Sequence, residues 1–278
     1  MSVQPAERPP TEQSPVEGQQ NRPTPLIRLR ARSALALALV SLLGVVAYAW
    51  PFFVSPGAAL DGSHSGDAPW VFVVLLPLLA AVVLAELSAG GIDAKAVAML
   101  GMLAAIGAAL RALGPGAAGL EPSFIVIVLG GRVFGRGFGF VLGCLTLFAG
   151  ALLTGGVGPW MPFQMFAAGW VGLLSGMLPQ LRGRVEVVML AAYGIVAGLL
   201  YGMLINLWFW PFGAYSPELA YVAGGSLGIN VHHYLVFWST TSLGWDVPRG
   251  ILTALAVLLA GRPVLAALRR TARRAHFT

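Results

Sequence analysis

AKAVAMLGMLAAIGAALRAL, residues 94–113, contains only two charged side chains, Lys95 near its start and Arg111 near its end. A helix of about 20 residues is about 30 Å long, which matches the hydrocarbon core of a membrane. The stretch therefore predicts a transmembrane helix. The rest of the chain decides whether this helix stands alone.

The composition of the whole chain places it in the membrane class. Of the 278 residues, 57% are hydrophobic and 10% are charged, and the mean hydropathy is +0.79. In soluble domains charged residues usually make up about a quarter of the total. The sequence therefore excludes a soluble domain and predicts an all-α integral membrane protein. The single cysteine, Cys144, excludes a disulfide framework and a cysteine-based zinc site.

The apolar runs define eight predicted spans. Residues 1–25 are rich in Pro, Gln, Glu and Ser and predict a disordered tail, which we extend to residue 30. Residues 227–243 predict an amphipathic surface helix before the last span. The fourth span is short and could be tilted or partly re-entrant. The predicted spans are residues 34–54, 70–88, 94–113, 120–134, 137–154, 161–179, 186–209 and 246–265.

The basic residues test this count. With the N-terminus in the cytoplasm, eight spans return the C-terminus there too. Of the 17 basic residues, all but Arg111 and Arg249 then lie on the cytoplasmic side, as the positive-inside rule requires. The net charge of +6 therefore reflects topology and attraction to lipid headgroups, and the sequence predicts no nucleic-acid partner.

Small side chains recur along one face of the third predicted span, at intervals of three and four residues. Such a stripe lets another helix backbone approach closely in lipid. Two readings stay open, packing within this chain and docking of a partner subunit. The stripe consists of Ala94, Ala98, Gly101, Ala105, Ala108 and Ala112, with Ala104 beside it.

GGRVFGRGFGF, residues 130–140, has glycines at alternating positions. A dinucleotide-binding loop would need a preceding strand and a βαβ unit, and the sequence predicts neither. The glycines instead predict a tight cytoplasmic turn between two closely packed spans, with Arg132 and Arg136 at its side.

Aromatic and amide side chains gather at the external ends of the last three spans. Part of this pattern is the aromatic belt of any membrane protein. Gln164 and Asn206, however, sit a turn or more inside their spans, where polar groups usually face a cavity or a partner. We therefore expect the Gly/Pro break at 155–162 to open a recess for a flat or ring-containing solute. The candidate substrate-binding residues are Trp160, Gln164, Asn206, Trp208, Asn230, His232, Trp238, Asp246 and Arg249.

Neither metal nor catalytic chemistry is predicted. His232 and His233 are adjacent, so on a helix their side chains point about 100° apart and do not easily share one ion. Ser175 and Ser226 lack the GxSxG context of a serine nucleophile. The sequence therefore predicts neither an enzyme nor a bound cofactor.

From Ala94 to the end, the chain resembles the substrate-binding S component of energy-coupling-factor (ECF) transporters. The resemblance rests on the AxxxA repeats of the first core helix, on LEPSFIVIVLGGRVFGRGFGFVLG (residues 120–143) and on GGVGPWMPFQMFAAGWVGLLSG (residues 155–176). It implies a six-helix core (94–268). Two additional N-terminal transmembrane helices (31–93) depart from the family pattern, and composition and charge predict a disordered cytoplasmic tail before them (1–30) and a basic cytoplasmic tail after the core (269–278).

The resemblance also implies a function. An S component binds a micronutrient on the outside, docks through its AxxxA face onto a transmembrane coupling subunit and topples to release the solute inside. The docking residues would be Ala94, Ala98, Gly101, Ala104, Ala105 and Ala108. No GxxxxGK[ST] motif occurs in the chain, so ATP would be used by partner ATPase subunits. The tryptophans and amides favour a vitamin or precursor as the solute, with a cobalamin-type compound as one candidate.

Two other functions stay open on the residues alone. A secondary transporter would normally show inverted repeats and intramembrane acids, and here Glu86, Glu121 and Asp246 lie toward span ends. A membrane-embedded enzyme would need a reactive constellation, which the sequence does not display.

Overall fold

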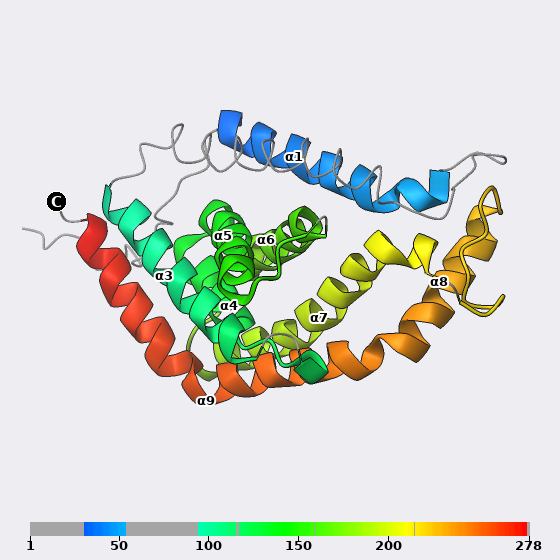
Figure 1. Ribbon diagram of the computed structural model, residues 1–278. Helices are drawn as coiled ribbons and strands as arrows, with labels where there is room; N and C mark the ends of the chain where they lie inside the picture. Colours follow the sequence, from blue (N-terminus) through cyan, green and yellow to red (C-terminus); the bar gives the residue numbers. More distant parts are fainter. Residues whose placement is uncertain (1–30, 54–93, 115–116, 159, 214, 277–278) are drawn as a thin grey trace, which may run out of the picture.

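Figure 1 shows the computed structural model of the chain, which describes residues 31–53, 94–114, 117–158, 160–213 and 215–276. Within these ranges all regular structure is helical, which confirms the predicted all-α class. The predicted tail (1–30) and second span (70–88) lie outside the described residues. The helices are α1 (Ala31–Ala49), η1 (Trp50–Phe53), α3 (Ala94–Leu113), η2 (Ala117–Gly119), α4 (Phe124–Phe134), α5 (Arg136–Thr154), α6 (Met161–Met177), α7 (Gly183–Phe209), η3 (Trp210–Phe212), α8 (Leu227–Thr241) and α9 (Leu243–His276).

Four of the described helices are long and apolar enough to cross a membrane. They contain the segments Lys95–Leu113, Arg136–Thr154, Gly183–Phe212 and Leu243–Arg273. This finding agrees with the predicted membrane class. The count of eight spans stays a prediction.

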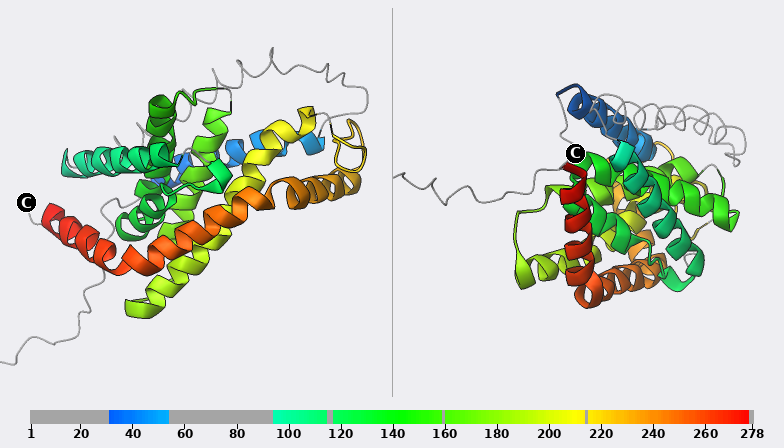
Figure 2. Two further views of the ribbon diagram at one scale, coloured as in Figure 1. Left: turned by 60° about the horizontal axis from the view of Figure 1, so that its bottom comes forward. Right: turned by 90° about the vertical axis from the view of Figure 1, so that its left-hand side faces the viewer.

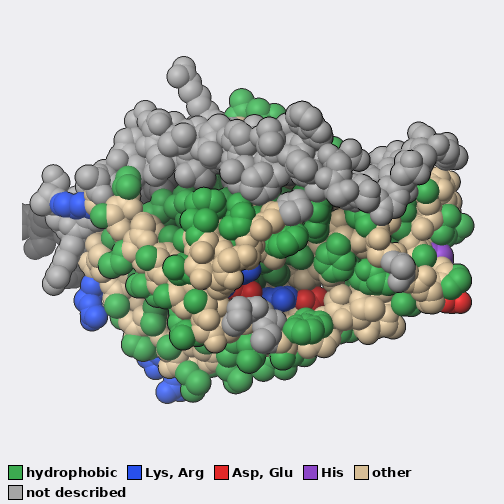
Figure 3. All heavy atoms as spheres, in the orientation of Figure 1, with side chains coloured by type: hydrophobic (Ala, Val, Ile, Leu, Met, Phe, Trp, Pro, Cys, Tyr) green, Lys and Arg blue, Asp and Glu red, His purple; other side chains and the backbone are tan. Residues whose placement is uncertain are grey.

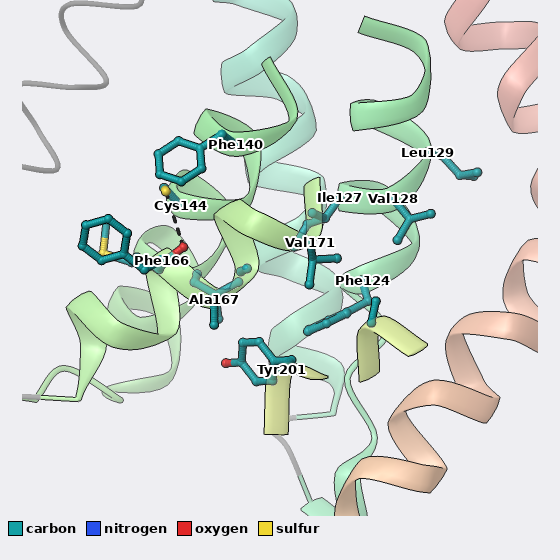
Figure 4. Packing of buried hydrophobic residues seen from close by; sticks show 14 of the residues in the cluster. Phe124, Ile127, Val128, Leu129, Phe140, Cys144, Phe166, Ala167, Val171 and Tyr201 are labelled. Atoms are coloured by element: carbon teal, nitrogen blue, oxygen red, sulfur yellow. Dashed lines mark hydrogen bonds between the residues drawn. The ribbon is translucent and has the colours of Figure 1, made fainter. Parts of the chain in front are cut away.

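Helix α4 is the short helix of the bundle core. It begins at Phe124, four residues later than the sequence predicted, and it contacts α3, α5, α6, α7 and α9. Residues 121–123 form a turn before the helix starts, where the missing N–H of Pro122 leaves no helical hydrogen bond unmade. Phe124 is fully buried and packs edge-to-face on Tyr201 of α7, with 5.0 Å between the ring centroids (Figure 4).

Glycines bring the backbones of α4, α5 and α6 into direct contact. A methyl group on Gly131 or on Gly139 would lie 2.2 Å from the carbonyl oxygen of Gly172. Gly135, the single residue between α4 and α5, has φ 97°, a backbone conformation that favours glycine. These contacts confirm the predicted tight turn between two closely packed helices.

Helices α7 and α9 form the second close pair. A methyl group on Gly198 would lie 2.6 Å from the backbone nitrogen of Gly250, and one on Gly194 would lie 2.8 Å from Thr253 Cγ2. The two helices therefore touch along successive turns, because glycines at positions 194, 198 and 250 put no side chain between the backbones.

Helix α9 runs further than the sequence predicted. The predicted span ended at residue 265, whereas the helix continues to His276 and includes most of the predicted basic tail. It bends between its orange and red parts (Figures 1 and 2), and Pro263, which removes a helical hydrogen bond, lies inside it. After the bend, Leu268 and Ala272 pack against the buried cluster of Leu103, Phe134 and neighbouring residues. This packing keeps the end of the chain helical.

Helix α1 lies along the bundle beside α6 and α7 (Figure 1). The Trp170 indole donates a hydrogen bond to Ser41 Oγ (3.1 Å), and the Tyr48 hydroxyl donates to the carbonyl oxygen of Phe163 (2.5 Å). Gly44 leaves room for the Trp170 ring, which a methyl group there would approach to 2.9 Å. The opposite face of α1, including Leu39 and Leu42, is exposed.

Candidate functional site

Two arginines and a buried glutamate join several helices at one end of the bundle. Glu186 Oε1 of α7 accepts hydrogen bonds from Arg132 Nε of α4 (2.7 Å) and Arg269 Nη2 of α9 (2.6 Å). Arg132 also donates to the carbonyl oxygens of Leu178 and Leu181 in the α6–α7 loop. We call this region, with the α4–α5 turn and the C-terminal part of α9, the basic end.

A cavity of about 360 Å³ lies toward the opposite end, which we call the cavity end. Its wall combines the last turns of α7 with α8 and the first turns of α9. Aromatic rings and short polar side chains alternate around it. The lining residues are Tyr201, Gly202, Ile205, Asn206, Phe209, Tyr215, Phe237, Thr241, Ser242, Trp245, Asp246 and Arg249.

A buried ion pair forms one side of the cavity. Asp246 and Arg249 are one turn apart on α9, and Arg249 Nη1 donates to Asp246 Oδ1 at 2.6 Å. The second carboxylate oxygen accepts a hydrogen bond from the Trp238 indole of α8 (2.9 Å). Gly202 of α7 leaves room for this carboxylate, because a methyl group there would lie 1.8 Å from Asp246 Oδ1 and would displace it.

Tyr201 connects this ion pair to a second polar cluster. The Arg249 guanidinium lies over the Tyr201 ring, 5.0 Å from its centroid. Tyr201 also interacts electrostatically with Arg111 and Glu121, which form an ion pair of 3.0 Å. Arg111 donates to Gln164 Oε1 at 3.3 Å. Figure 3 shows acidic and basic side chains together in a hollow in the middle of one otherwise largely apolar face.

Polar hydrogen bonds and neutral phenols complete the cavity wall. The Asn206 amide donates to Ser242 Oγ at 2.5 Å, which ties α7 to the α8–α9 junction. Burial raises the pKa of Tyr215, so its phenol stays neutral and can both donate and accept hydrogen bonds. The site thus offers aromatic faces, amide and hydroxyl groups, and two ion pairs that are each neutral overall.

The structure brings some of the predicted substrate residues together and not others. Asn206, Asp246 and Arg249 line the cavity. Trp238 does not line it, but its indole donates a hydrogen bond to Asp246, which does. Gln164 belongs to the neighbouring cluster around Arg111.

Four other candidates point elsewhere. Trp208 packs on Phe163, with 4.7 Å between the ring centroids. Asn230 uses its amide to hold the backbone N–H and C=O of Val222, at 2.9 Å each. His232 is exposed, and Trp160 is 41% exposed beside the Gly/Pro break. None of these four lines the cavity.

Sequence reasoning did not include Arg111, Glu121 and Tyr201 among the site residues. One signal was available for Arg111, which with Arg249 departs from the cytoplasmic placement of the other basic residues. A charge at the external end of an apolar span needs a partner, and here Glu121 supplies it. Tyr201 carries no such signal, because a tyrosine in an apolar helix is ordinarily interpreted as a residue of the hydrophobic core.

The small-residue stripe of α3 divides into an exposed and a buried part. Ala98, Gly101 and Ala105 are exposed, and a methyl group on Gly101 would meet no atom within 4 Å. Ala104 and Ala108 are buried, at 5% and 1% exposure. The side chain of Ala94 lies outside the described residues.

Among the residues that the structure describes, no three His, Cys, Asp or Glu side chains group as a metal site would require. The rings of His232 and His233 are 6.2 Å apart.

Comparison with known proteins gives the family. The sequence model of the ECF transporter substrate-specific component matches residues 95–261, which span α3 to the middle of α9. No curated protein and no solved structure matches the chain. The match covers more than half of the sequence and includes every helix that lines the cavity. The chain therefore belongs to the family of substrate-specific components of ECF transporters.

Proposed function

We propose that this chain binds a small micronutrient in the cavity formed by α7, α8 and α9 and delivers it to an ECF module for ATP-driven uptake. One observation supports the proposal most strongly. The family match coincides with an aromatic-walled cavity that contains a buried Asp246–Arg249 pair. Buried charges within a membrane bundle are costly and usually mark a solute pathway or site.

The cavity end faces the outside in this proposal. The predicted topology puts several basic residues on the same side of the membrane as the basic end, namely Lys95, Arg132, Arg136 and Arg182. Basic segments resist translocation, so this side is cytoplasmic in the proposal. Both chain termini are then cytoplasmic. Arg111 and Arg249 face outward, but each is paired with a carboxylate.

The cavity favours a solute of one or two rings. Its volume of about 360 Å³ lies at the low end of the roughly 300–1,000 Å³ of small-molecule pockets, which disfavours a cobalamin-type ligand. Each arginine at the site has its own carboxylate, so a net charge on the solute would be left uncompensated in a dry environment. We therefore expect a vitamin or vitamin precursor that is uncharged or zwitterionic.

The exposed part of the α3 stripe is the proposed docking face. Ala98, Gly101 and Ala105 leave the helix backbone open to a partner helix. The partner is the transmembrane coupling subunit of an ECF module, whose ATPase subunits supply the energy. Exposed arginines on the last turns of α9 would contact lipid headgroups.

The direct test is to purify the chain alone, extract bound small molecules and identify them by mass spectrometry. We expect a compact ring compound with no net charge, and we expect titration calorimetry to show that it rebinds. Asp246→Asn should weaken that binding because it leaves Arg249 without its counter-charge. A solute that binds Asp246→Asn and the parent equally would place the site elsewhere.

The rival function is a secondary transporter. Reconstituted vesicles separate the two, since an S component without ATPase partners should bind the solute but not accumulate it. Uptake by the chain alone, driven by an ion gradient, would contradict the proposal.

A further inference from the structure

We propose that Pro51 and Phe52, at the end of the additional N-terminal helix, are positioning residues for the solute cavity. They belong to the N-terminal strap, which we define as α1 and η1 (residues 31–53). The importance of the cavity rests on the function proposed above, whereas the contacts and the test described below do not.

The strap is held in a defined place along the bundle. Ser41, Gly44 and Tyr48 each contact α6, through the Trp170 indole or the Phe163 carbonyl oxygen. Tyr48 is 3% exposed, and its ring also packs edge-to-face on Phe163 at 5.1 Å. The end of α1 is therefore anchored where η1 reaches the cavity end.

Residues of η1 contact the segment that contributes Tyr215, Phe237 and Thr241 to the cavity wall. This segment, which we call the cover, consists of α8 and the described loop residues 215–226. The Tyr221 hydroxyl of the cover donates a hydrogen bond to the Pro51 carbonyl oxygen at 2.5 Å. The Phe52 ring lies 6.4 Å from the Tyr234 ring of α8 in an edge-to-face contact, and 6.1 Å from the Trp210 ring of η3.

These contacts continue to the cavity wall. Trp210 is fully buried and donates its indole N–H to the Leu219 carbonyl oxygen of the cover (2.7 Å). Phe237 packs against Trp210 at 6.5 Å and against Tyr215 at 4.8 Å. Phe237 and Tyr215 both line the cavity. A chain of aromatic contacts thus runs from Phe52 to the wall.

The cover depends on such contacts because its loop forms neither a helix nor a strand, so no regular backbone hydrogen bonding holds it. Side-chain hydrogen bonds hold it at Leu219, Ala220, Tyr221 and Val222. At three of these residues the partner side chain belongs to η3 or α8, whereas Tyr221 donates its own hydroxyl to the strap, 170 residues away in sequence. Loss of the strap contacts should therefore loosen the cover locally and leave the helical core intact.

Access to a buried cavity residue tests this inference without a solute. Ser242 lines the cavity and is 7% exposed, and Ser242→Cys changes one atom of its side chain. The native Cys144 is fully buried in the core, where its thiol donates to the Met165 carbonyl oxygen (Figure 4). A methanethiosulfonate reagent, with the modified positions counted by mass spectrometry, reports cavity opening at position 242 and global unfolding at position 144.

In the Ser242→Cys background, Phe52→Ala should raise the labelling rate at position 242 by about tenfold, and labelling of Cys144 should stay slow. Tyr221→Phe removes one hydroxyl and should give a smaller increase. Phe52→Leu keeps apolar volume and should restore much of the protection. Leu42→Ala, on the exposed face of α1, is the matched control and should change neither rate.

Two results would overturn the inference. One is an unchanged labelling rate at position 242 in both Phe52→Ala and Tyr221→Phe. The other is a rise in both variants that Cys144 labelling follows in parallel, since the strap would then stabilise the whole fold rather than position the cover. Neither result bears on whether the chain binds a micronutrient, which the copurification experiment decides separately.

Discussion

At the scale of single residues, the site depends on where side chains are missing as much as on where they are present. Gly202 lets the Asp246 carboxylate lie directly against the backbone of α7, and Asp246 in turn orients Arg249 and Trp238. The helix could carry alanine at this position by propensity. With alanine at position 202, however, the Asp246 carboxylate would have to move.

Gly202→Ala should therefore damage the site. The added methyl group would lie 1.8 Å from Asp246 Oδ1, and overpacking of this kind costs about 1–3 kcal/mol. We expect a lower melting temperature in detergent and weaker solute binding. Gly101→Ala, where the methyl group meets nothing within 4 Å, is the control and should leave the melting temperature unchanged or slightly higher. Equal melting temperatures for the two variants would contradict the role given to Gly202.

At the scale of helices, α3 presents two different faces within one stripe of small residues. The sequence alone leaves internal packing and partner docking as alternatives. The structure assigns Ala104 and Ala108 to the interior of this chain and leaves Ala98 and Ala105 exposed. One substitution on each side can therefore separate packing from docking.

Ala105→Trp should weaken association with the coupling subunit by about tenfold or more, because a large side chain holds two helix backbones apart. Its melting temperature and solute affinity should match the parent. Ala108→Trp should instead destabilise the protein itself, since Ala108 is 1% exposed. Copurification with the module and thermal melting measure the two effects. Normal copurification of Ala105→Trp would remove α3 as the docking helix.

The C-terminal part of α9 gives a second prediction at this scale. Arg269 bonds to the buried Glu186, whereas the next residue, Arg270, is exposed. Arg269→Ala should cost about 1 kcal/mol of stability, since solvent screens a partly exposed partner. Arg270→Ala should cost much less. Thermal melting of both variants decides this, and equal losses would mean that the Glu186 contact adds no stability.

The elements were predictable where their cause is local. Residues 94–113 read as a span because their own apolar length is sufficient, and the turn at Gly135 follows from glycines close by in sequence. The extension of α9 was not predictable, because Glu186, which holds Arg269, is 83 residues away. Asn230 shows the same limit at the site. Its amide reads as a ligand group, but the backbone of Val222 satisfies it.

At the scale of the whole molecule, two charged regions separate along the bundle. The basic end holds an arginine–glutamate cluster, and the cavity end holds two neutralised ion pairs. Charge counting predicts that most basic residues lie on the cytoplasmic side, and this orientation stays a prediction. The pairing of Arg111 with Glu121 and of Arg249 with Asp246 required the fold.

Reporter fusions test the orientation. We expect an external signal from fusions at residues 57, 116, 157 and 220, and a cytoplasmic signal from fusions at residues 25, 91, 183 and 275. The two signals should alternate without exception. An external signal at residue 275 would rule out an even number of spans with a cytoplasmic N-terminus.

The contact between α7 and α9 limits how a solute can travel. Gly198 lies one turn below Gly202, and there the backbone of α7 rests against Gly250 of α9. One turn beyond the cavity wall, the two helices therefore touch through their backbones, and the rotation of a side chain would not separate them. The cavity therefore does not continue as a channel between α7 and α9. In the proposed function, a solute would therefore not pass between these two helices and would leave by the opening through which it entered, so delivery across the bilayer would require that opening to change sides.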